Sequence, residues 1–264
     1  KKNIKKTKQG FIVQALEDQY TGGQIIDCRY SRPSHVSKAV WQTFYGYEIV
    51  LDKTFSLKNE VVLMGDLRYE SSGIFFNYLI PISSKTLLFQ ITYIGTHYFL
   101  PSELEDEVKL LVNKLFKNKW TIRRTEYGNL LQHGNYPKTN IPEATKGGSH
   151  WGALRASSGY AFSRILQWSS EKADEIVYAK PKITSKPFNN SIQNYMDSVF
   201  LKLIRLSPDQ TCKTLINFGK KLEPDVFARF MNDSARIGDF LKIILICPKK
   251  AMIKAALTWR FNKP

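Results

Sequence analysis

The feature that most constrains the fold is a series of short β-type segments at close intervals along the first hundred residues. Each is rich in β-branched and aromatic residues and is bounded by turn residues or charges. The expected strands are residues 10–16, 23–28, 41–51, 61–67, 73–81 and 85–94, with a turn at 20–22. Such short intervals leave no room for crossover helices, so we expect an antiparallel sheet rather than βαβ units.

The hydrophobic pattern then changes to a helical period. Apolar residues of 101–116 form one stripe: Leu104, Val108, Leu111, Val112 and Leu115. Ser102 is expected to cap this helix, with Glu105 completing a capping box. A strand at 120–131 and a loop at 136–149 follow. Further helices are expected at 157–178, 194–206, 209–222, 224–231 and 237–257, with a linker at 180–191. The order of sheet, loop and helical tail predicts an α+β protein.

The composition limits the classes of partner. The 264 residues suit one domain or two small ones, and the formal net charge is +16. The lysines are scattered, with local density only at 1–8 and 248–254, and no zinc-finger, RNP or KH signature occurs. A solvated basic surface is therefore favoured over an anionic membrane surface, and no nucleic-acid partner is expected.

Metal and disulfide chemistry are not expected. The three cysteines lie far apart, and the four histidines lack metal-ligand spacing. Residues 1–8 are basic, but no apolar stretch of signal-peptide length follows them. The longest apolar run, 240–247, is interrupted by Lys242 and is too short to span a bilayer. We expect a soluble or membrane-surface protein in a reducing compartment.

Six segments carry a family resemblance. In chain order they are 25–29 (IIDCR), 41–48 (WQTFYGYE), 63–68 (LMGDLR), 75–83 (FFNYLIPIS), 154–162 (LRASSGYAF) and 227–231 (FARFM). Together, over most of the chain, they resemble bacterial lycopene β-cyclases, flavoproteins that close the end rings of a carotenoid. The resemblance implies a p-hydroxybenzoate-hydroxylase-like fold, with FAD as a cofactor that is not consumed.

The resemblance also implies a domain organisation. Residues 1–38 correspond to a residual part of a flavin-binding domain, 39–135 to a substrate-binding β-sheet region, 136–180 to a return into the flavin-binding domain, and 181–264 to a C-terminal helical region. The family's Gly-x-Gly-x-x-Gly turn does not occur in this sequence. We therefore expect the chain to lack the N-terminal dinucleotide-binding segment.

The implied reaction is redox-neutral: an acid protonates a terminal alkene, an internal double bond attacks the cation, and a base removes a proton. Gln90 and Ile91 stand where the family has an acidic pair, so Glu48 or Asp66 must supply the acid, or the chain does not cyclise. Each has a simpler interpretation. Glu48 fits an ordinary solvent-facing position, and Asp66 fits a surface ion pair with Arg68.

The remaining site residues are also implied by the resemblance. The flavin contacts would be Asp27, Arg155, Ser157, Ser158, Gly159 and Tyr160. The substrate contacts would be Tyr45, Tyr47, Arg68, Phe76 and Tyr78. Strand alternation cannot place all the aromatic residues of this region on one face, so most are expected in the core.

Three functions stay open at this stage. The first is a lycopene cyclase acting on an acyclic carotene, cytoplasmic and peripheral to the inner face of the membrane. The second is an inactive homologue that binds flavin or carotenoid, because Gln90 is an amide. The third is an unrelated basic protein that binds a membrane or a nucleic acid. Residues 237–257, with lysines among Leu, Ile and Met, fit a helix pair on the core or a membrane-surface segment.

Overall fold

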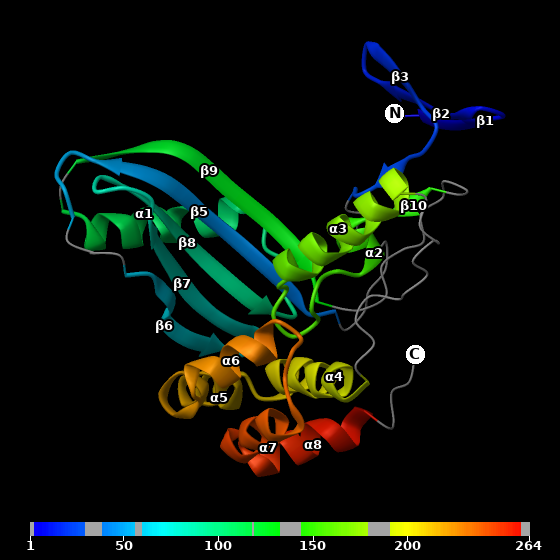
Figure 1. Ribbon diagram of the computed structural model, residues 1–264. Helices are drawn as coiled ribbons and strands as arrows, with labels where there is room; N and C mark the ends of the chain where they lie inside the picture. The colour runs from blue at the N-terminus through cyan, green and yellow to red at the C-terminus, as the bar shows by residue number, and fades with distance from the viewer. Residues whose placement is uncertain are drawn as a thin grey trace. The chain divides into compact units, whose positions relative to one another are not determined.

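The computed structural model describes residues 3–29, 39–55, 60–117, 119–132, 144–178 and 191–259 (Figure 1). The chain divides into two compact units. The larger unit joins Ser37–Gln132 to Ser191–Pro264, so the C-terminal helices belong with the sheet. The smaller unit joins Lys1–Val36 to His133–Asn190.

The larger unit is built on a five-stranded sheet. Its strands are β5 (Trp41–Leu51), β6 (Val62–Glu70), β7 (Gly73–Pro81), β8 (Thr86–Gly95) and β9 (Trp120–Leu131). They lie in the order β6-β7-β8-β5-β9, and every pair is antiparallel. The antiparallel sheet predicted from the spacing of the segments is confirmed.

Helix α1 (Pro101–Leu115) covers one face of this sheet. Its buried Leu104, Val108 and Val112 pack against the aromatic and aliphatic residues that β5, β7 and β8 direct to that side. The predicted Ser102–Glu105 cap is wrong. Pro101 occupies the first helical position, so Leu100 is the N-cap residue and its N–H donates to Glu103 (2.6 Å).

Helices α4 (Ser191–Leu206) and α5 (Pro208–Lys221) pack on the opposite face, near the end of the sheet that carries Ile74 and Ile94. The short helix α6 (Pro224–Met231) follows α5. The helix expected over 237–257 is two helices, α7 (Ile237–Ile246) and α8 (Lys249–Trp259). The interruption falls at Pro248, which has no N–H to continue the ladder.

The smaller unit begins with the antiparallel strands β1 (Asn3–Thr7), β2 (Gly10–Ala15) and β3 (Asp18–Gly22). The turn predicted at 20–22 is therefore wrong, because this segment pairs along β2. The chain instead reverses at Leu16, which has a φ of 40°.

The rest of the smaller unit is a short parallel pair followed by helices. Strand β4 (Ile26–Asp27) pairs with β10 (Thr145–Lys146), and α2 (Gly148–Trp151) and α3 (Phe162–Tyr178) come next. The expected loop at 136–149 is described only from residue 144 onward. Within the described ranges, no helix combines the length and apolarity needed to cross a bilayer.

Candidate active site

The candidate acid Glu48 and the amide Gln90 share the sheet face opposite α1. In the register of β5 and β8, Glu48 lies across from Leu88 and Gly46 lies across from Gln90. Residues directly opposite each other in an antiparallel pair point to the same face, so Glu48 and Gln90 are diagonal neighbours. On the other side of β5, Glu48 lies across from Arg124 of β9.

Two glycines shape this face. A Cβ on Gly46 would stand 2.8 Å from the Cβ of Gln90, and a Cβ on Gly128 would collide with the ring of Phe44. The side chains of Gln90 and Phe44 therefore lie over bare backbone. A larger residue at position 46 would also meet the backbone of Phe89 and Gln90, so β8 would have to shift, whereas one at position 128 would force the Phe44 ring to move.

Glu48 is held by two arginines. Arg123 donates from Nη1 to Glu48 Oε1 (2.8 Å), and Nε of Arg124 lies 3.4 Å from Glu48 Oε2. The Glu48 side chain is only 9% exposed, whereas both arginines are mostly exposed. Both oxygens of Glu48 are therefore turned toward guanidinium groups.

A β-bulge brings both arginines to Glu48. Residues 48 and 124 are partners, but Ile49 pairs with Ile122, so Arg123 is the extra residue. In a regular strand, two successive side chains would point to opposite faces. Sequence reasoning missed both arginines, because nothing in the pattern of residues 120–131 marks the bulge.

Asp66 lies apart from Glu48 and Gln90. Its carboxylate is 3.4 Å from Nη1 of Arg68, and its side chain is 62% exposed. Arg68 also pairs with Glu107 of α1 and lies over the Phe75 ring, 4.7 Å from its centroid. Arg68 therefore belongs to the α1 side of the sheet, and the predicted surface ion pair with Asp66 is present.

The aromatic residues divide between the two faces, as strand alternation predicts. Tyr45 and Tyr47 are buried in the cluster beneath α1, where the Tyr47 hydroxyl donates to Glu105 (3.2 Å). Burial raises the pKa of Tyr47, and its hydroxyl stays protonated. Phe76 and Tyr78 face the other way, with ring centroids 5.3 Å apart, and Tyr78 lies across from Gln90. Burial also raises the pKa of Tyr78.

In the smaller unit, residues 155–160 form a tight turn before α3. The N–H of Arg155 donates to the Tyr160 carbonyl (2.9 Å), and the N–H of Gly159 donates to the Arg155 carbonyl (2.8 Å). Gly159 has a φ of 67°, which favours glycine. Ser157 and Ser158 lie in this turn rather than in the helix predicted from residue 157, because α3 begins at Phe162.

Of the predicted flavin contacts, the turn before α3 is better placed than the Asp27 carboxylate to bind a polar or anionic group. It leads into the N-terminus of a 17-residue helix, whose first N–H groups have no intrahelical partner. Asp27 is buried, and its carboxylate already accepts three hydrogen bonds from Arg29: one from the backbone N–H (3.2 Å) and two from the guanidinium (2.8 and 3.0 Å). The N–H groups at the start of α3 are thus the donors suited to a polar or anionic group, because those of the turn already bond within it, and the Asp27 carboxylate is occupied by Arg29.

The α+β architecture of this chain matches that of a solved structure. It resembles a geranylgeranyl bacteriochlorophyll reductase-like protein from Thermoplasma acidophilum, with a TM-score of 0.59 and 9% sequence identity, over 95% of this chain and 67% of that one. The predicted fold class is confirmed. The family described as "Lycopene cyclase protein" matches residues 4–257, so the chain belongs to the lycopene cyclase family.

Two further solved structures match less well. A peptidyl tryptophan dihydroxylase has a TM-score of 0.41 and 9% identity, over 87% of this chain and 52% of that one. Anhydrotetracycline hydroxylase from Streptomyces rimosus has a TM-score of 0.40 and 9% identity, over 96% and 49%. The chain thus spans about half the length of these two proteins. No curated protein matches the sequence.

Proposed function

We propose that this chain is a lycopene cyclase that binds an acyclic carotene against the sheet face of Glu48 and Gln90. The reaction would be a redox-neutral, proton-initiated closure of the carotene ends to β-ionone rings, converting lycopene to β-carotene. Membership of the family supports the reaction class. The observation that carries the site is the diagonal placement of Glu48 and Gln90 on neighbouring strands of one face.

Glu48 is the proposed proton carrier. An alkene is a very weak base, so the acid must be a protonated group in a site that excludes water. Arg123 and Arg124 occupy the two Glu48 oxygens, so the proposal requires these contacts to open when an apolar substrate covers the face. Gln90 can orient the substrate end through its amide but cannot deliver a proton. The ring of Tyr78, which lies across from Gln90, would stabilise the cation through its π face.

FAD is the proposed cofactor. The first backbone N–H groups of α3 and the Ser158 hydroxyl would hold it, and the internally bonded turn of residues 155–160 would position them. When bound, the flavin would supply a polar ring and negative charge without net oxidation or reduction. The chain's own residues would bind and orient the carotene and exchange the proton.

A second candidate function is carotenoid binding without cyclisation. Three observations favour it: Glu48 and Asp66 are both ion-paired with arginine, and position 90 carries an amide. The protein would then retain the apolar face and lack an acid ready to protonate the alkene.

The experiment is pigment chromatography of a lycopene-accumulating bacterial host that expresses the chain. The chain is tested alone and joined to a Gly-x-Gly-x-x-Gly flavin-binding segment. Monocyclic or bicyclic carotene is expected, and Glu48→Gln should lower its formation about 100-fold or more, as for loss of a general acid. Glu126→Gln is the matched control, because Glu126 pairs with Arg124 on the same strand face, and it should keep activity.

The outcomes separate the two candidates. Equal conversion by wild type and Glu48→Gln would exclude Glu48 as the proton carrier. No conversion by the wild-type chain in either form, with conversion gained by Gln90→Glu, would establish the second candidate and identify the missing acid as its cause.

A further inference from the structure

Helix α7 exposes an apolar face. Its buried side is formed by Asp239, Phe240 and Ile243, which pack toward the rest of the unit. The opposite side presents four large aliphatic residues, each more than half exposed: Ile237, Leu241, Ile244 and Leu245. No other described residue covers this face, which is unusual for a helix of a water-exposed bundle.

Helix α8 also exposes aliphatic residues, and lysines border them. It packs on α4 through Ala255 and its neighbours, so its other side faces outward. At 100° per residue, the exposed Ile253 and Leu257 lie in the middle of that side. Lys249 lies at one edge of this pair, and Lys250 and Lys254 lie at the other.

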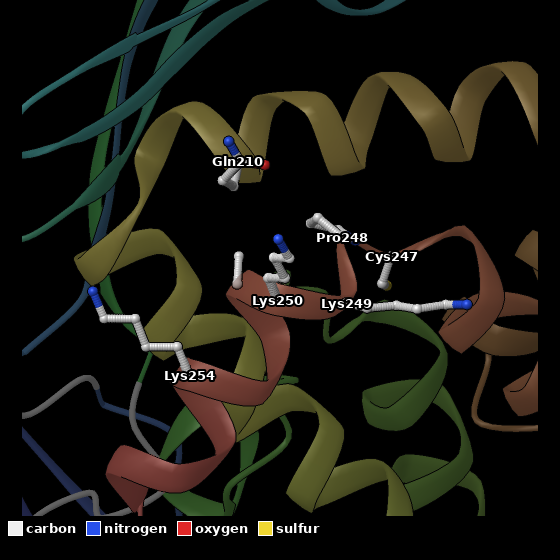
Figure 2. Close-up of a pocket in the computed structure, with 7 residues that line it drawn as sticks. Gln210, Cys247, Pro248, Lys249, Lys250 and Lys254 are labelled. Atoms are coloured by element: carbon white, nitrogen blue, oxygen red, sulfur yellow. The ribbon is translucent and has the colours of Figure 1, made fainter.

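The lysines of α8 also line a hollow. The hollow has a volume of about 740 Å³. Figure 2 shows its lining residues, with Gln210 of α5 on one side and Lys249, Lys250 and Lys254 of α8 on the other. The sequence of α8 contains no acidic residue. The acids near α7 are already paired: Glu223 with Lys242 (2.7 Å), and Asp239 with Arg229 (2.7 Å) on the buried side. The exposed side of α8 is therefore apolar at its centre and positively charged at its edges, and α7, the preceding helix, exposes further aliphatic residues.

We infer that the exposed sides of α7 and α8 form a docking surface for an anionic phospholipid bilayer. The aliphatic residues would enter the boundary between headgroups and acyl chains, and the lysines would meet the phosphates. The two helices have 10 and 11 residues, a length for lying in the interface rather than spanning it. This surface does not involve Glu48 or Gln90, and its binding to lipid needs no carotene.

The test is co-sedimentation of the full chain with vesicles of phosphatidylcholine alone or of an equimolar mixture with phosphatidylglycerol. Binding should be strong only with the mixture and should fall as salt is added. Leu241→Ser with Leu245→Ser should weaken it about tenfold or more. Lys250→Gln with Lys254→Gln should weaken it about fivefold for each lysine removed. All four positions are exposed, so the fold should be retained.

The matched control is Leu110→Ser with Lys114→Gln, two exposed positions on α1 that should leave binding unchanged. The inference is overturned if the chain ignores anionic vesicles, or if the α1 variant weakens binding as much as the others. It is also overturned if equilibrium sedimentation shows a dimer that the α7 substitutions dissociate, with no lipid binding. Because no pigment is measured, these outcomes are independent of the cyclase proposal.

Discussion

The two faces of the five-stranded sheet differ in what they bury. On the α1 side, Tyr47, Phe89 and Ile91 are almost fully buried in one apolar cluster. On the other side, the same strands present Glu48, Gln90 and Thr92. Because side chains alternate along a strand, the middle of β5 and β8 is apolar core on one face and polar on the other, whereas the end that α4 and α5 cover is core on both faces. The difference predicts that substitutions on the α1 side destabilise the fold, while those around Glu48 and Gln90 cost less stability and change the proposed site.

Adjacent residues of β8 give the largest expected contrast. Phe89→Ala, on the α1 side, should lower the free energy of unfolding by about 3–5 kcal/mol, because it leaves a large cavity. Leu88→Ala, on the half-buried opposite side, should cost only about 1 kcal/mol. Urea unfolding followed by circular dichroism measures both. Similar losses would mean that both faces are closed cores.

The sheet could be predicted from sequence because its strands alternate regularly and are separated by clear turn residues. The expected bounds of β5, β7 and β9 coincide with those observed. The hairpin formed by β2 and β3 was missed in part, since polar residues such as Asp18 and Gln19 carry no hydrophobic alternation. The cap of α1 was misplaced because Pro101 competes with Ser102 as the start signal.

The site was less predictable, because it depends on pairing between distant segments. Alternation alone could not show that Glu48 and Gln90 share a face, since that follows from the register of β5 with β8. The two arginines at Glu48 depend on a single extra residue in β9. The family resemblance identified Gln90 as a position where this chain lacks the family's acid. No sequence pattern revealed that two arginines contact Glu48.

Glu48→Gln tests whether the opposite face also contributes stability. It removes the ion pairs with Arg123 and Arg124, and we expect a loss of about 1–2 kcal/mol at low salt, because the bonds are charge-assisted. The loss should shrink as salt increases, since both arginines are mostly exposed. Unfolding in urea at two ionic strengths measures it. A loss comparable to that of Phe89→Ala would place Glu48 among the core residues.

Thr92→Val should stabilise the protein. The Thr92 hydroxyl is fully buried on the site face and has no hydrogen-bond partner among the described residues. Replacing it by a methyl group of similar size removes an unsatisfied polar group, with an expected gain of about 1 kcal/mol. Thermal unfolding is the measurement. A loss of stability would indicate that the hydroxyl has a partner, and a bound substrate or cofactor is then the group to test.

Tyr47→Phe has the smallest expected effect at neutral pH and isolates one polar contact of the α1 side. Loss of the hydrogen bond to Glu105 should cost about 0.5 kcal/mol. Because burial raises the pKa of Tyr47 in the folded state, wild type loses stability as the pH rises above the unfolded pKa of about 10. The variant has no hydroxyl to ionise, so its stability should fall less steeply above about pH 10, and the stability curves of wild type and variant should converge or cross.

The exposed Tyr69→Phe is the control, and its stability curve should follow that of wild type. Parallel curves for wild type and Tyr47→Phe would show that this hydroxyl reaches solvent, and that the α1 face is less closed than its aromatic packing indicates.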